Sequence, residues 1–319
     1  MRWTNINSGH EESWMPDLAS LVADRLANPK PLLSNKHSAE KLGDSILRQL
    51  YEGKRSTGSL RLSQSGACIR QLAYQYHHAE EDGLGIDAAS KLAFIVGDTT
   101  EAIIASALLE AFEGGGAGTL FNALSEQEEV HMDVPIRDGY KAVVAGHPDG
   151  SMMVMSQNSQ PIHAILEIKS MSEYGFNKFR KEGLGPGDGY YSQVQSYMEC
   201  KGYKWAYLLA YSKTAGAKDA ELYDDGSWLP VSALHGQWIK YDPEEVDRIK
   251  SKFRRVIESK EPEEIERPHG PNKKGLLSFP CDYCRYYKRC FPFAEEQVHE
   301  SRWLKKNQKI KVSVGEHND

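Results

Sequence analysis

The feature that most constrains the fold is a block of four short β-type runs between two helical patterns. The runs read EEVHMDVPI, YKAVVAG, SMMVMS and HAILEIKS, and the turn signals RDG (137–139) and PDG (148–150) lie between members of the block. Before it, residues 89–112 carry apolar side chains at helical spacing, and EGGGAG (113–118) ends that pattern. After it we expect helices over 190–200 and 243–260, and strands over 204–213 and 236–242. This order of elements indicates an α/β chain.

The first sixty residues are polar, and we expect them to be mainly helical, with helices near 16–27 and 38–52. A further helix is expected to start near Ser63 or Ser65 and to run through CIRQLAYQYHHA. The longest apolar runs, such as AYLLAY (206–211), are too short to span a bilayer, and the N-terminus lacks the apolar block of a signal peptide. We therefore expect a cytoplasmic protein with no membrane segment.

The net charge of −6, from 39 basic and 45 acidic residues, argues against a nucleic-acid coat protein with a uniformly basic surface. It is compatible with a nucleic-acid enzyme, which needs only a local basic track beside an acidic metal site. The length of 319 residues allows one large domain or two ordinary ones.

The last β-type run carries an acid and a base in an otherwise apolar strand. Because side chains alternate across a strand, Glu167 and Lys169 share one face. Asp149 lies in the turn between two of the runs, where its carboxylate can project from the sheet. One interpretation is a common turn sequence and a surface ion pair at a strand end. The other is a Mg²⁺ or Mn²⁺ site with Asp149 and Glu167 as oxygen ligands, where Lys169 orients a water and stabilises charge on a phosphate.

Two helical patterns add polar residues to this candidate site. Gln193 and Tyr197 are four apart and so share one face of their helix, which either faces the site or simply packs on the sheet. Glu101 lies within the 89–112 helix among apolar neighbours, where a solvated helical charge is the alternative interpretation.

The ordered set Glu101, Asp149, Glu167-Ile168-Lys169 and Gln193…Tyr197 resembles the PD-(D/E)XK nuclease superfamily, specifically its RecB-like exonuclease branch. The resemblance covers about residues 90–212. Many RecB-like members have histidine at the first position, and in this respect Glu101 is closer to the phage lambda-type exonucleases.

This resemblance implies a restriction-endonuclease-like α/β core, with a mixed central sheet flanked by helices. It implies a metal-dependent DNA exonuclease in recombination, repair or phage DNA processing, in which Asp149, Glu167, the Ile168 carbonyl and Glu101 hold Mg²⁺ or Mn²⁺. A DNA-binding or assembly subunit that has lost catalysis, and an endonuclease of the same superfamily, are the alternatives. DNA is the expected partner; a helicase or annealing protein is a further possibility, and the oligomeric state is unknown.

Three of the five cysteines, Cys281, Cys284 and Cys290, lie within ten positions near the C-terminus. Three thiolates need a fourth ligand to close a tetrahedral zinc site or to hold an iron–sulfur cube, and Cys68 is the candidate. The spacing is compatible with both zinc and iron, and a disulfide is less expected in a cytosolic chain. Cys200 lies outside the pattern and is expected to be a buried thiol.

One upstream cysteine and three near the C-terminus resemble the iron–sulfur nucleases of the AddB and CRISPR-associated type, as does the CIRQLAY context of Cys68. The resemblance implies a structural 4Fe–4S cluster on Cys68, Cys281, Cys284 and Cys290 that holds the ends of the nuclease domain together. It divides the chain into an N-terminal helical region (1–88), a nuclease core (89–260) and a C-terminal cysteine segment with a tail (261–319).

Two basic groups are candidates for DNA contacts, with a solvated charged surface as the alternative for each. The first lies just before the glycine-rich loop EGLGPGDG (182–189), and the second surrounds the cysteines, with tyrosines that could stack on bases. The first group consists of Lys178, Arg180 and Lys181, and the second of Lys273, Lys274, Arg285, Lys288 and Arg289 with Tyr283, Tyr286 and Tyr287.

Overall fold

The structure of the protein is a computed structural model. It describes residues 3–7, 12–29, 31–33, 39–40, 42–44, 46–47, 59–82, 88–115, 118–124, 127–213, 220–222, 228–230, 233–271, 277, 279–281, 284–292, 294–295 and 311–312.

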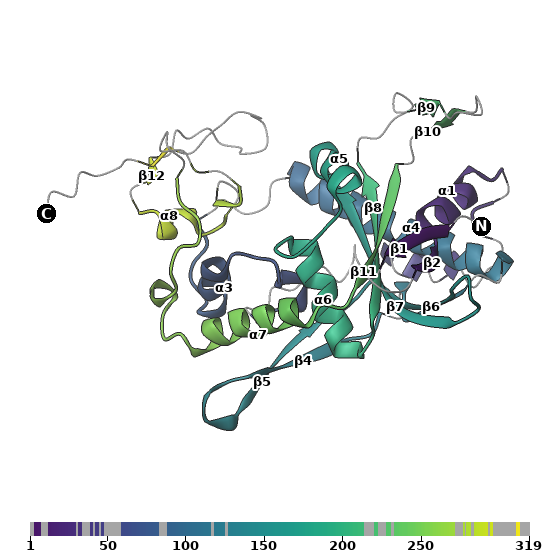
Figure 1. Cartoon of the computed structure of the whole chain (residues 1–319). Helices are drawn as coiled ribbons and strands as arrows, with labels where there is room; N and C mark the ends of the chain where they lie inside the picture. Colours follow the sequence, from purple (N-terminus) through teal and green to yellow (C-terminus); the bar gives the residue numbers. More distant parts are fainter. Residues whose placement is uncertain are drawn as a thin grey trace, which may run out of the picture.

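A five-stranded mixed sheet forms the centre of the molecule, with strand order β11–β8–β7–β6–β3 (Figure 1). β7 and β8 are parallel, whereas the other neighbouring strands are antiparallel. The acid–base strand β7 is interior, as its apolar run predicts, because β6 and β8 pair with its two edges. The strands of this sheet are β3 (Gly118–Phe121), β6 (Gly150–Met155), β7 (Pro161–Met171), β8 (Trp205–Ser212) and β11 (Leu234–Lys240).

Helices cover both faces of the sheet (Figure 1). α1 (Leu18–Ala27) and α4 (Ala88–Gly115) share one apolar core with one face. α6 (Gly189–Lys201) and α7 (Pro243–Glu258) share a second core with the other face, together with α3 (Ile69–Tyr76). α5 (Glu173–Glu182) and α6 form the connection between the parallel strands β7 and β8. This arrangement confirms the α/β class with a mixed central sheet flanked by helices.

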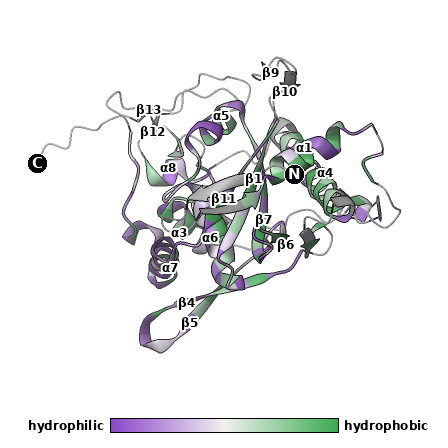
Figure 2. Ribbon diagram, turned by 45° about the vertical axis from the view of Figure 1, so that its right-hand side comes forward, coloured by the Kyte–Doolittle hydropathy of each residue, from purple (hydrophilic) through white to green (hydrophobic). Residues whose placement is uncertain are grey.

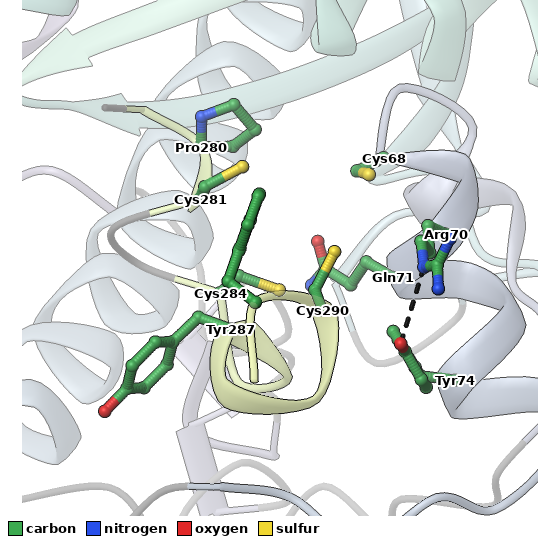
Figure 3. A pocket seen from close by; sticks show the side chains of 10 residues that line it. Cys68, Arg70, Gln71, Tyr74, Pro280, Cys281, Cys284, Tyr287 and Cys290 are labelled. Atoms are coloured by element: carbon green, nitrogen blue, oxygen red, sulfur yellow. Dashed lines mark hydrogen bonds between the residues drawn. The ribbon is translucent and has the colours of Figure 1, made fainter. Parts of the chain in front are cut away.

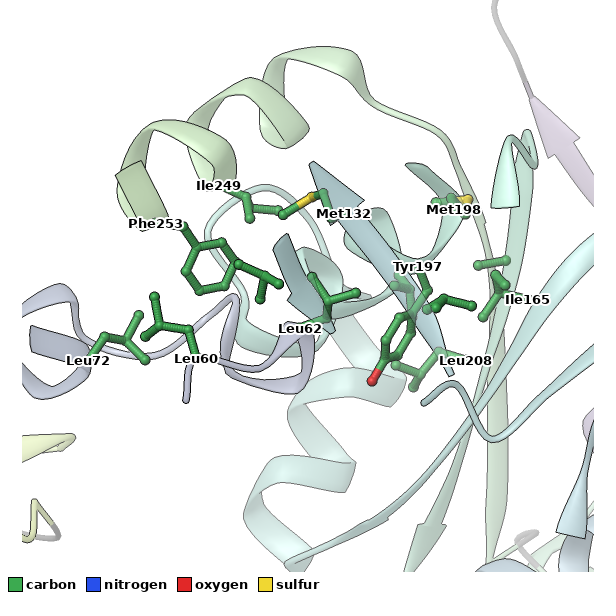
Figure 4. Packing of buried hydrophobic residues seen from close by; sticks show 14 of the residues in the cluster. Leu60, Leu62, Leu72, Met132, Ile165, Tyr197, Met198, Leu208, Ile249 and Phe253 are labelled. Carbon is green, nitrogen blue, oxygen red and sulfur yellow. The ribbon is translucent and has the colours of Figure 1, made fainter. Parts of the chain in front are cut away.

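The core on the α6 and α7 side joins segments from distant parts of the chain (Figure 4). Leu62, Met132, Tyr197 and Phe253 are all buried in it, at 0–1% exposure. α7 turns an apolar face to this core, and its hydrophilic residues give it the purple colour of Figure 2. The proline at the start of α7 follows Asp242, whose carboxylate caps the helix by accepting from the Glu244 and Glu245 amides. The amphipathic pattern of 243–260 therefore predicts this helix correctly.

A two-stranded sheet of β4 (Val130–Pro135) and β5 (Lys141–Gly146) extends from the molecule (Figure 1). Alternate side chains of β4 are buried against α6 and α7, which fixes the register of the hairpin. The chain leaves β5 and enters β6 of the central sheet through residues 147–149. Asp149 therefore lies where the chain passes from one sheet to the other.

The N-terminal segment departs from the helical expectation. β1 (Trp3–Asn7) and β2 (Glu12–Pro16) form an antiparallel hairpin, so the expectation of a mainly helical segment is wrong there. Trp3, Thr4 and Ile6 have the aromatic and β-branched side chains that favour strands. The helix expected near 16–27 is present as α1. Within 38–52, the described residues 39–40, 42–44 and 46–47 are helical, and the rest of that prediction lies outside the described residues.

The helix expected from Ser63 or Ser65 begins later, because a 3-10 turn, η1 (Leu62–Gln64), precedes α3. The remaining short elements are η3 (Arg137–Gly139), η5 (Pro262–Glu264), α8 (Tyr287–Cys290), the pair β9 (Ala220–Leu222) and β10 (Trp228–Pro230), and the pair β12 (Ala294–Glu295) and β13 (Lys311–Val312).

One helical stretch, Lys91–Glu113 within α4, is long and apolar enough to cross a membrane by length and composition. The expectation that every apolar stretch is too short overlooked it, because no uninterrupted apolar run marks this helix. Ile104, Leu108 and Phe112 are buried in the core between α4 and the sheet. Only part of the helix is buried, however, since Leu92, Phe94 and Val96 are 49–61% exposed. A single helix of this length and composition is weak evidence for a membrane span.

Candidate active site and cysteine pocket

β7 carries an acid and a base on the face that α6 covers. Glu167 is fully buried, and Gln193 on α6 donates to its Oε1 over 2.5 Å. Lys169 forms an ion pair with the same oxygen. Leu166 and Ile168 point to the opposite face, into the core shared with α4. The alternation read from the sequence thus places the acid and the base side by side against α6.

Asp149 reaches the same place from the connection between β5 and β6. Its Oδ2 accepts the backbone N–H of Ile168 over 2.7 Å and lies 3.6 Å from Lys169 Nζ. Lys169 Nζ also donates to the Ile168 carbonyl over 3.1 Å. The ammonium group therefore faces three oxygens, which belong to Asp149, Glu167 and Ile168.

A close backbone approach brings α6 to this site. A Cβ at Gly146, the last residue of β5, would lie 2.8 Å from Leu62 Cβ and 3.0 Å from a ring carbon of Tyr197. Only glycine fits there without displacing these side chains. Tyr197 is fully buried below it, and Gln193 donates to its hydroxyl over 3.3 Å. Gln193 therefore links Tyr197 to Glu167, and both helix residues of the predicted set lie at the site.

Glu101 approaches from α4. Burial first, and then the charge of Asp149, raise the pKa of Glu101 well above its ordinary value, and its carboxyl group hydrogen-bonds to Asp149. The positive charge of Lys169 opposes that shift. Glu101 is therefore a partly buried neighbour of the other two acids, and the interpretation of a solvated helical charge does not hold.

The site concentrates charge in a buried space. Burial raises the pKa of Glu167 to about 8, with the negative charge of Asp149 acting in the same direction and Lys169 acting against it. Burial alone would lower the pKa of Lys169, but the surrounding carboxylates raise it well above its ordinary value. Lys169 is therefore charged at neutral pH and balances the acids around it.

One atom of this site has no hydrogen-bond partner. Oε2 of Glu167 is buried and receives no hydrogen bond, although Oε1 of the same carboxylate receives two contacts. A buried carboxyl oxygen without a partner is costly unless a proton or a cation satisfies it. With its pKa raised to about 8, Glu167 holds a proton at neutral pH in the absence of a cation. Among the described residues no three acidic, histidine or cysteine side chains lie in a ready-made metal-binding arrangement. The Lys169 ammonium instead lies between the carboxyl group of Glu167 on β7 and that of Asp149.

The four predicted cysteines line one pocket (Figure 3). Cys68 immediately precedes α3, Cys281 and Cys284 lie in the loop before α8, and Cys290 is the last residue of α8. The structure thus brings together cysteines more than two hundred residues apart in the chain. Arg70 and Tyr74 of α3 line the same pocket. Cys200 does not: it lies on α6, and burial raises the pKa of its thiol to about 12.

Ion pairs also join the two segments that carry the cysteines. Asp82, which follows α3, accepts the backbone N–H groups of Lys288 and Arg289 over 2.7 and 3.2 Å, and so caps α8. Glu81 pairs with Arg285 at 3.0 Å, and Glu80 with Arg289 at 3.4 Å. The acidic run 80–82 therefore holds the segment 285–290 against α3.

These contacts bear on the predicted DNA contacts around the cysteines. Arg285 and Arg289 form ion pairs with the acidic run 80–82, which therefore competes with DNA phosphates for these two side chains. Tyr286 stacks on Tyr74 with ring centroids 5.4 Å apart, and Tyr287 is 1% exposed, which contradicts a role for either in stacking on bases. Lys273, Lys274 and Tyr283 lie outside the described residues. The other basic group, Lys178, Arg180 and Lys181, lies on α5, which starts two residues after β7 ends.

Sequence reasoning missed the acidic run and two cations beside the cysteines. The signal for the first was present: EED at 80–82 is complementary in charge to the basic residues at 285–289. Lys252 of α7 and Arg267 contact the backbone at Ala67 and Cys290, over 3.2 and 3.1 Å. No local pattern predicts these contacts, because the partners lie far away in the chain.

A scan of the sequence against protein families finds no match, and a search of curated proteins finds none either. Among solved structures, the protein SSO0001 is similar with a TM-score of 0.41 and 14% identity, over 80% of this chain and 96% of its own. The alkaline exonuclease LHK-Exo from Laribacter hongkongensis is similar with a TM-score of 0.35 and 18% identity, over 69% of this chain and 90% of its own. A phage-related exonuclease from Haemophilus somnus is similar with a TM-score of 0.31 and 12% identity, over 62% of this chain and 92% of its own. TM-scores this low do not establish a function.

Proposed function

We propose that this protein is a divalent-metal-dependent deoxyribonuclease that hydrolyses phosphodiester bonds at the site on β7. The observation that carries the proposal is the buried, unpartnered Oε2 of Glu167, in a site where Asp149 and Glu101 add further carboxyl groups. Hard carboxylate and carbonyl oxygens are the ligands that Mg²⁺ and Mn²⁺ prefer.

The residues present fit such an ion. The Lys169 ammonium is already surrounded by oxygens of Asp149, Glu167 and Ile168, so this set favours a cation. The oxygens of Asp149 and Ile168 in this set would hold the metal together with Oε2 of Glu167, with Glu101 as a further ligand. When bound, the ion would supply Lewis acidity toward the phosphate and lower the pKa of a water.

The protein's own residues have separate tasks in this proposal. Lys169 stabilises negative charge on the scissile phosphate and orients the attacking water, because its ammonium lies beside the carboxylates. Gln193 holds Glu167 through Oε1, which leaves Oε2 free for the ion. The Tyr197 hydroxyl accepts a hydrogen bond from Gln193 and so holds the Gln193 side chain in place. Gln193 and Tyr197 are therefore positioning residues.

DNA as the substrate rests on the ordered motif and on the basic residues of α5, the helix that follows β7. The Gln193…Tyr197 helix favours the RecB-like branch, and hence digestion from linear ends. Recombination, repair or phage DNA processing is the setting that such an activity fits, with a cytoplasmic location.

End-labelled linear and closed circular DNA, each with and without Mg²⁺, test this proposal. We expect Mg²⁺-dependent digestion of the linear substrate and loss of digestion in Lys169→Met and Glu167→Gln. Lys204→Met, which replaces an exposed lysine just before β8, is the matched control and should digest normally. Digestion by Lys169→Met at the wild-type rate would exclude this site, and digestion of circles would favour an endonuclease.

We further propose that Cys68, Cys281, Cys284 and Cys290 hold a structural metal centre, for which a 4Fe–4S cluster is the first candidate and zinc the second. Their common pocket supports the fit, since cysteine side chains from both ends of the domain face one space. Such a centre would offset the entropy of closing a loop of more than two hundred residues. Anaerobic purification followed by iron, sulfide and zinc analysis distinguishes the two. The absence of both iron and zinc from the purified protein would refute the centre.

A further inference from the structure

Arg70 is a buried cation that no acid neutralises directly. It is 9% exposed, and its guanidinium donates to the Ile265 carbonyl over 2.6 Å and to the Tyr74 hydroxyl over 3.4 Å. Within the described residues, no carboxylate lies at ion-pair distance from it; Glu263 reaches it only through the Tyr74 hydroxyl. Burial of an uncompensated charge is costly, so this arrangement calls for a negative partner.

Lys252 is a second cation of this kind, on α7. It is partly buried, and its Nζ donates to the carbonyls of Ser65 and Ala67, just before Cys68. The acid near it, Glu245, is already paired with Arg248. Lys252 forms no ion pair within the described part of the chain.

Both cations lie beside the cysteine pocket. Arg70 lines it from α3, the helix that begins directly after Cys68 (Figure 3). The positive charge of Arg70 acts on the thiol of Cys290, and Lys252 interacts electrostatically with Cys68. Four neutral thiols would gain little from two such cations. Four thiolates around zinc or an iron–sulfur cube carry net negative charge, which these cations would balance.

We propose that Arg70, supported by Lys252, is the counter-charge of a thiolate-ligated centre of net negative charge held by the four cysteines. This inference rests on the proposed metal centre and is independent of the nuclease assignment. Arg70 and Lys252 are positioning residues here, since they ligate nothing and act by their charge.

The test uses the full chain, purified anaerobically with its metal, in the variants Arg70→Met, Arg70→Lys and Lys252→Met. Arg254→Met, which removes an exposed cation of α7, is the matched control. Two quantities are measured: the rate at which EDTA removes the metal, and, where iron is present, the midpoint potential of one-electron reduction by dithionite. Circular dichroism checks that each variant is folded.

We expect Arg70→Met to lose metal about tenfold faster than the wild type, and Lys252→Met to lose it several-fold faster. For an iron centre, reduction adds a negative charge, so Arg70→Met should make reduction about tenfold less favourable. A tenfold change in the equilibrium constant of one-electron reduction lowers the midpoint potential by about 59 mV. Arg70→Lys keeps the charge and should stay close to wild type, as should Arg254→Met.

Equal metal loss in Arg70→Lys and Arg70→Met would show that the guanidinium geometry matters rather than its charge, and would overturn the inference. Wild-type behaviour of folded Arg70→Met would do the same. If Arg70→Met does not fold, Lys252→Met decides, because it leaves the contacts of α3 with Ile265 in place. Absence of metal from the wild type would remove the centre and this inference together, while Mg²⁺-dependent digestion of DNA would be unaffected.

Discussion

Replacing Asp82 by alanine tests how the C-terminal cysteine segment is held. The Asp82 carboxylate is 9% exposed and accepts the backbone N–H groups of Lys288 and Arg289 over 2.7 and 3.2 Å, at the start of α8. Loss of a capping carboxylate costs about 1 kcal/mol, and hydrogen bonds to a charged group in a partly buried place raise that to about 2 kcal/mol. Since 1.4 kcal/mol is a factor of ten, the open state of the segment should become about thirtyfold more populated.

Native-state hydrogen exchange measures this change. In Asp82→Ala, the amides of 287–290 should lose about thirtyfold in protection, whereas those of the central strand β7 should keep theirs. Glu81→Gln is the control, because the pair of Glu81 with Arg285 is 43% and 53% exposed and should contribute little. Unchanged protection in Asp82→Ala, or an equal loss in Glu81→Gln, would refute the reasoning that the cap holds this segment.

Three further predictions concern other parts of the molecule. Gln193→Ala should lower the rate of Mg²⁺-dependent digestion about tenfold or more with little change in melting temperature, because it releases Glu167 Oε1; equal rates for variant and wild type would argue against this role. Phe253→Ala, at 0% exposure in the core between α3 and α7, should cost about 3–5 kcal/mol in denaturant unfolding, and a cost below about 1 kcal/mol would contradict the packing. Glu199 lies between Lys250 and Tyr241, and although its burial acts in the opposite direction, hydrogen bonds from both lower its pKa below the ordinary 4.5. Its contribution to stability is therefore complete above about pH 4.5 and is lost as the pH falls through the lower pKa of the folded state, so Glu199→Gln should flatten the acid limb of a stability–pH curve.

Most of the central sheet was predictable because its signals are local. The alternation in HAILEIKS and the turns around it are enough to place β6 and β7, and Pro243 with its amphipathic run is enough for α7. The edge strand β3 was not predicted, because its four residues directly follow the glycine-rich end of α4. The hairpin β1–β2 was not predicted, since its strands are short and depend on pairing with each other. α5 was not predicted either, because its basic residues were interpreted as a surface for DNA and not as part of a helix.

The candidate site shows a similar division. The spacing of Glu167 and Lys169 on a strand, and of Gln193 and Tyr197 on a helix, fixes which residues share a face. Neither spacing tells that the two faces meet; that depends on the absence of a side chain at Gly146 and on the path of the chain between two sheets. The burial of Glu101 and the counter-charges around the cysteines likewise arise from tertiary packing.

The most direct measurement of the central claim is anomalous diffraction from crystals grown with Mn²⁺. The account predicts an anomalous peak about 2.0–2.6 Å from carboxylate oxygens of Asp149 and Glu167 and from the Ile168 carbonyl oxygen, with the Lys169 ammonium moved aside. A fully loaded crystal in which Mn²⁺ binds elsewhere, and Lys169 still bridges the two carboxylates, would contradict it.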